Sequence, residues 1–200
     1  MIETVMVFTL AATALLGSPG PGIAALIAVG RSRGAIGGLR YFGSMQLGLA
    51  LAAGLSAAGL VAVIRAFPVI HAALMIVSVA YLLWLAWAIA SAPLSGSIGD
   101  DAPSGAFTLP GGFMLGFANP KAYLAFASLF GSFAILTPAY GFADGLLKWT
   151  LCVVVMAVVD LAWLLAGVAL GRLTLTPRAE RIMNLAMGGA ILLACIAALA

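Results

Sequence analysis

The charged side chains of this chain fall into short clusters, and long apolar stretches separate them. Residues 41–64, for example, carry no charged side chain. A helix needs about 20 apolar residues in a row to cross the hydrocarbon core of a bilayer, and the stretches between clusters reach that length. The pattern therefore predicts several membrane-spanning segments. The clusters are Arg31, Arg33 and Arg40; Asp100 and Asp101; and Arg172, Arg178, Glu180 and Arg181.

Composition excludes an ordinary soluble domain. Of the 200 residues, 64% are hydrophobic and 8% are charged, and the mean hydropathy is +1.22; a soluble domain has about 25% charged residues. A chain this short cannot bury so much apolar surface within its own core, so we expect it to lie in a lipid bilayer. The spanning segments should be helices, because they lack the polar–apolar alternation of barrel strands. A net charge of +3 without a basic stripe gives no sign of a nucleic-acid partner.

Turn signals divide the chain into six predicted membrane helices. Proline interrupts helices, and the residue before a proline is also unfavourable in one; Pro68 and Pro138 mark two boundaries in this way. The positive-inside rule places the arginine clusters on the cytoplasmic side of the cytoplasmic membrane. Both termini are therefore predicted to lie on the outer side of that membrane. The predicted helices are residues 2–30, 38–64, 67–91, 110–137, 145–171 and 179–200.

The first and fourth predicted helices contain residues that break helices. Residues 17–22 read Gly-Ser-Pro-Gly-Pro-Gly, and residues 118–121 read Ala-Asn-Pro-Lys. Backbone groups freed by such breaks are costly in lipid unless they face protein or a wet cavity. Paired broken helices mark the substrate site in many transporters, and a pair of structural kinks is the alternative.

The positions of the breaks predict one transmembrane transporter domain, residues 1–200, built as an inverted repeat of three plus three helices. The first repeat is expected over about residues 1–91 and the second over about 110–200, with a polar loop at 92–109 between them. Because each repeat has an odd number of helices, the second enters the membrane from the opposite side.

Lys121 and Asp160 are charged side chains inside apolar segments. A lysine at the centre of a membrane helix costs roughly 2.5–3.5 kcal/mol on insertion scales, so we expect a compensating partner. Asp160 could supply it through an ion pair that joins two helices, or it could instead relay protons or bind an ammonium group. Ser18 and Gln46 are polar enough to line a pathway, and equally suited to packing hydrogen bonds.

No catalytic constellation is recognisable in the sequence. The chain has a single histidine and few acids, and it shows neither metal-ligand spacing nor a nucleophile motif. We therefore predict that the protein is not an enzyme and binds no cofactor or metal.

Several motifs together resemble those of the LysE/RhtB superfamily of amino-acid exporters. They are Gly17-Ser18-Pro19-Gly20-Pro21-Gly22; Gly112-Phe113-x-x-Gly116-Phe117-x-Asn119-Pro120-Lys121; and Asp160-Leu161-Ala162-Trp163. The resemblance implies six helices, no enzymatic cofactor, and export of amino acids or similar small metabolites driven by the proton or membrane-potential gradient. It carries two substrate-facing breaks over to this sequence, namely Pro19, Gly20, Pro21 and Gly22, and Asn119, Pro120 and Lys121.

One departure from the family pattern concerns the second helix. Many members carry an acid directly after a glycine there, whereas Gly48 is followed by Leu49 in this chain. The predicted function is a secondary transporter that works by alternating access, coupled to the proton or membrane-potential gradient, and protons are among its predicted partners. An exporter of another solute such as a cation, or a structural subunit of a membrane complex, stays open as the alternative, and so does a homo-oligomer.

Overall fold

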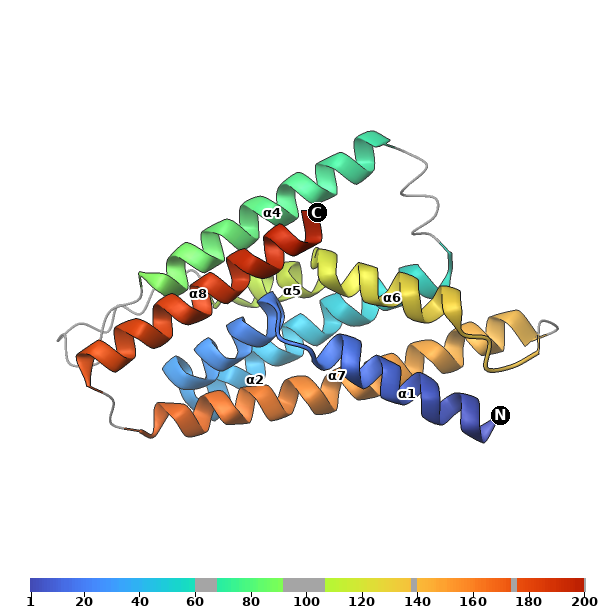
Figure 1. Ribbon diagram of the computed structural model, residues 1–200, viewed down its shortest axis with the longest axis horizontal. Helices are drawn as coiled ribbons and strands as arrows, with labels where there is room; N and C mark the ends of the chain where they lie inside the picture. The colour runs from blue at the N-terminus through green and yellow to red at the C-terminus, as the bar shows by residue number, and fades with distance from the viewer. Residues whose placement is uncertain (60–67, 92–106, 138–139, 174–175, 200) are drawn as a thin grey trace.

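A computed structural model of the protein describes residues 1–59, 68–91, 107–137, 140–173 and 176–199. Within these ranges the chain is helical without strands, as predicted, and the helices lie side by side in one elongated bundle (Figure 1). Their bounds are α1 (Ile2–Gly17), α2 (Pro21–Ala57), α4 (Pro68–Ala90), α5 (Leu109–Phe117), α6 (Pro120–Ser132), α7 (Gly141–Gly171) and α8 (Pro177–Leu199).

The helices differ in how well each could cross a membrane alone. Among the described residues, α7 is the one helix that is long and apolar enough by itself, and α1 with α2 qualifies as a bent pair with 65° between the two helices. Helices α5 and α6, with 9 and 13 residues, are each shorter than a span. The six spans therefore remain a prediction.

Helix α2 is a hairpin of two helical arms that turn at Gly34. This glycine has φ 65° and ψ −166°, a backbone conformation that is essentially restricted to glycine. The reversal brings Gly22, at the start of the first arm, next to Met45 in the second: a Cβ at Gly22 would lie 3.6 Å from the Met45 sulfur. In a straight helix these residues would be about 34 Å apart. The predicted boundary between residues 30 and 38 corresponds to this turn.

Two pairs of helices are each separated by a short non-helical segment. Helix α1 ends at Gly17 and α2 begins at Pro21; helix α5 ends at Phe117 and α6 begins at Pro120. In Figure 1, α1 and the first arm of α2 run from right to left, whereas α5 and α6 run from left to right. The two pairs therefore have opposite directions in the bundle.

Glycines allow the backbones of the central helices to approach closely. Helix α2 lies in the middle and packs mainly against α7 and α5, while α4 pairs with α8 (Figure 1). Between α2 and α5, a Cβ on Gly48 would lie 2.7 Å from the Phe117 nitrogen, and one on Gly116 would lie 2.9 Å from the Leu49 nitrogen. Small residues commonly permit such contacts between membrane helices.

Two predicted helix ends were wrong. The second predicted helix extends to residue 64, but α2 ends at Ala57, followed by Gly59 with φ 73°, because a glycine in this conformation terminates a helix. The fourth extends to 137, but α6 ends at Ser132 and the chain becomes extended at Phe133. Residues 60–67 and the polar-loop residues 92–106 lie outside the described ranges.

The glycine contact between α2 and α5 predicts how substitutions behave. Gly116→Ala should lower the free energy of unfolding by about 1–3 kcal/mol, because its methyl group would overlap the α2 backbone. Gly43→Ala is the matched control: Gly43 also lies in a helix, α2, but it is exposed and its Cβ would meet nothing within 4 Å, so the stability of this variant should be unchanged or higher. Thermal unfolding in detergent measures both, and equal midpoints for the two variants would contradict the close approach.

Candidate functional site

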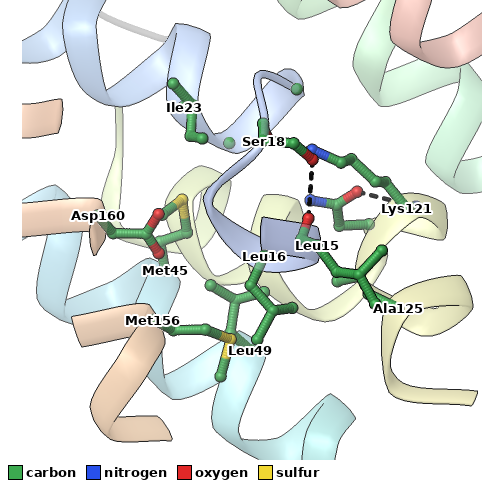
Figure 2. A pocket seen from close by; sticks show the side chains of 14 residues that line it. Leu15, Leu16, Ser18, Ile23, Met45, Leu49, Lys121, Ala125, Met156 and Asp160 are labelled. Atoms are coloured by element: carbon green, nitrogen blue, oxygen red, sulfur yellow. Dashed lines mark hydrogen bonds between the residues drawn. The ribbon is translucent and has the colours of Figure 1, made fainter. Parts of the chain in front are cut away.

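The two breaks lie against each other around a small cavity (Figure 2). The cavity has a volume of about 40 Å³, which is room for a few water molecules. The two breaks and α7 contribute the polar lining residues Ser18, Asn119, Lys121 and Asp160, together with Gly20 and Gly22. The remaining lining residues are apolar: Leu15, Leu16, Ile23, Met45, Leu49, Ala122, Ala125 and Met156.

Lys121 joins the second break to the first. Its ammonium nitrogen donates to the carbonyl oxygen of Ser18 and, at 3.0 Å, to that of Pro19. These carbonyls follow the end of α1, where backbone acceptors have no partner within the helix. Gly20 leaves room for the lysine, because a Cβ there would lie 2.8 Å from Lys121 Cδ and 3.0 Å from Nζ. The ammonium and the free carbonyls therefore satisfy each other.

Asn119 and Pro120 start helix α6 beside the cavity. The Asn119 side chain caps the helix, since Oδ1 accepts a hydrogen bond from the Lys121 backbone nitrogen at 3.1 Å. Proline suits the first position of a helix because it has no N–H that would need a partner there. Pro21 begins α2 in the same way after Gly20. These residues fix the direction in which α6 and α2 leave the breaks.

Asp160 lies on the opposite side of the cavity from Lys121 (Figure 2). It is 6% exposed, and its Oδ2 accepts a hydrogen bond of 2.7 Å from Gln46 Nε2. Lys121 and Asp160 interact electrostatically, but the ion pairs found among the described residues do not include a direct contact between them. The ion-pair alternative is therefore not the arrangement in this structure, in which the cavity separates the two charges.

The residues singled out in the sequence fall into two groups. Ser18, Gly20, Gly22, Asn119, Lys121 and Asp160 line the cavity, whereas Pro19, Pro21, Pro120 and Gln46 are not part of its lining. Gln46 contacts the site through Asp160, because its Nε2 donates a hydrogen bond to the Asp160 carboxylate. Leu49, at the position where many family members carry an acid, also lines the cavity. Asp160 is the one acidic residue of the lining.

Two ion-pair clusters away from the cavity were not predicted. In the first, Arg31 near the Gly34 turn donates to Glu180 at 2.5 Å and to Asn184 at 2.9 Å, both on α8. Glu180 and Asn184 are each 3% exposed. The cluster joins α2 to α8, so Asn184 has a packing role here. The sequence placed Arg31 and Glu180 in two separate charge clusters and gave no sign that they meet.

The second cluster holds the segment that follows α6. Lys148 pairs with Asp144 at 2.7 Å and donates to the carbonyl oxygens of Phe130 and Phe133. Asp144 Oδ1 accepts hydrogen bonds from the backbone nitrogens of Ile135 and Leu136, at 2.8 and 2.7 Å. These contacts satisfy backbone groups outside the helix, which explains why α6 ends at Ser132. A spacing of four residues on α7 is the one sequence signal for the pair.

The buried pair on α7 predicts a stability effect. Lys148→Met should lower the free energy of unfolding by about 3–5 kcal/mol, because it leaves the Asp144 carboxylate buried without its cation. Adding Asp144→Asn removes that charge while keeping an oxygen for the backbone nitrogens, so the double variant should regain part of the loss. Thermal unfolding in detergent tests this, and a Lys148→Met protein as stable as the parent would refute it.

Comparison with known proteins gives one match. The model of the LysE type translocator family matches residues 13–200, nearly the whole chain, which confirms the resemblance stated from the motifs. No curated protein and no solved structure gives a significant match. The matched range includes both breaks and all of the cavity lining.

Proposed function

Because this chain belongs to the LysE type translocator family, a family of membrane transport proteins and not of enzymes, we propose that it exports amino acids or related small metabolites. The export would run across the cytoplasmic membrane by alternating access, coupled to the proton or membrane-potential gradient. The observation that carries this proposal is the position of the two breaks. They border one cavity, and its two charges, the half-buried Lys121 and the buried Asp160, lie on different sides of it.

The proposed architecture is six spans in an inverted repeat. The α1–α2 and α5–α6 pairs would be the broken first spans of the two repeats, and their opposite directions in Figure 1 support this. The second arm of α2 and α7 would be the second spans, and α4 and α8 the third. The Gly34 turn and the junction of α7 with α8 would then lie at one end of the bundle, together with the arginine clusters.

The two charges of the cavity fit the two charges of an amino acid. Lys121, together with the positive N-terminal end of α6, would attract the carboxylate. Asp160 would bind the amino group or carry the coupling proton. In apolar surroundings such contacts are stronger than in water, so they would favour a zwitterion over a neutral solute of the same size.

Transport by this site requires movement. A cavity of about 40 Å³ has room for a few water molecules, so an amino acid can enter after helices around the cavity move apart. The cluster of Arg31 with Glu180 joins α2 to α8, and the cluster of Lys148 with Asp144 joins α7 to the end of α6. We propose that these contacts hold the protein closed while no solute is bound.

Counterflow in proteoliposomes tests the function. Purified protein is loaded with a mixture of amino acids, and uptake of each labelled amino acid is measured with and without a proton gradient. Lys121→Ala and Asp160→Asn should each reduce exchange at least tenfold, because a hydrogen bond to a charged group contributes about 1.5–3 kcal/mol. Leu124→Ala is the matched control: it lies on the same helix, but its side chain is half exposed on the bundle surface, so exchange should persist.

The outcomes separate this proposal from its alternatives. Unchanged exchange in folded Lys121→Ala and Asp160→Asn proteins would contradict the assigned site. No exchange of any amino acid by folded parent protein would favour another solute, such as a cation, or a structural role in a membrane complex. A stable partner recovered on gentle purification would support the structural role, and a single larger species of this chain would indicate a homo-oligomer.

Membrane orientation can be tested separately. The arginine-rich end should face the cytoplasm, which puts both termini outside. Alkaline phosphatase fused after α8 should therefore be active in a bacterial host, and green fluorescent protein fused at the same place should stay dark. Bright fluorescence with inactive phosphatase would reverse the orientation.

A further inference from the structure

We infer that the solute has one amine, one carboxylate and an apolar remainder, so that neutral amino acids with apolar side chains are carried and basic or acidic ones are rejected. This inference rests on the proposed function and specifies its substrate class. It follows from the charges, the free hydrogen-bonding positions and the walls of the cavity.

The cavity lining carries one charge of each sign. Lys121 is the one cationic residue and Asp160 the one anionic residue in the cavity lining. The α-amino and α-carboxylate groups of an amino acid match them one to one. A third charge, on a basic or acidic side chain, would have no opposite charge in the lining, and a charge buried without a partner is strongly unfavourable.

Both charged groups of the cavity can make further hydrogen bonds. A lysine ammonium has three donors, and Lys121 uses two on the carbonyls of Ser18 and Pro19. Asp160 uses Oδ2 on Gln46, and in the described part of the chain no hydrogen bond reaches its Oδ1. Lys121 therefore keeps one donor for a carboxylate, and Asp160 keeps its Oδ1 as an acceptor for an amine.

An apolar wall of the cavity would receive the side chain of the solute. Met45 and Met156 lie beside Asp160, and Leu16 and Leu49 lie next to Met156 (Figure 2). These side chains come from three helices and present no charged or hydrogen-bonding group apart from the weakly accepting thioether sulfur. Methionine is flexible and fills irregular space, so the wall can adapt to aliphatic side chains of different shapes.

The experiment compares labelled solutes in counterflow with the unmodified protein. Leucine, methionine and valine should exchange at least ten times faster than lysine, arginine and glutamate. Lysine exchange as fast as leucine exchange would overturn the inferred substrate class while leaving the export function intact. Absence of exchange for every amino acid, from folded protein, would instead overturn the proposed function on which the inference rests.

A charge introduced into the wall gives a second test. Leu49→Glu would add a carboxylate to the lining, so lysine exchange should rise at least tenfold relative to leucine exchange. Leu49→Gln has nearly the same size without the charge and should not gain lysine exchange. Met156→Glu places a carboxylate on α7 in the same wall and serves if Leu49→Glu does not fold. Folded glutamate variants that gain no lysine exchange would contradict the inference.

Discussion

The contact between the Lys121 ammonium and the carbonyls that follow α1 is the interaction on which the centre of the structure depends. Neither partner is stable alone in apolar surroundings: the carbonyls have lost their helical donors, and the ammonium needs acceptors. Each break supplies what the other lacks. The two non-helical segments are therefore held face to face, and the space they leave between them and α7 is the cavity.

The sequence indicated features that depend on local chemistry. Proline and glycine end helices wherever they occur together, so residues 17–22 and 118–121 stood out, and the arginines around Gly34 indicated a turn. Lys121 and Asp160 were recognisable because a charge in an apolar stretch is rare. A sequence gives the depth of a residue along its helix more readily than the direction in which it points. This is why it left open whether the two charges touch.

Other features arise from contacts between distant segments and have no local signal. The chain leaves the helix at Phe133 because Asp144 and Lys148 bind its backbone from another helix. The pairing of Arg31 with Glu180 joins residues 149 positions apart. The apolar cavity wall was also invisible, since Leu49 or Met156 looks like any other core residue of a membrane helix until its neighbours are known.

The glycine contact between α2 and α5 limits how this protein can move. At Gly48 and Gly116 the two backbones are so close that a methyl group on either would overlap the other helix. If one helix slid by one residue, the larger side chain of Leu47, Leu49, Leu115 or Phe117 would replace a glycine at this contact. The two helices therefore cannot shift along each other, and they behave as one rigid body. Any rearrangement that opens the cavity must therefore occur at surfaces where side chains, rather than backbones, meet. Helices α1 and α6 border the cavity through leucine, lysine and alanine side chains, so these two helices can move relative to the rigid pair of α2 and α5.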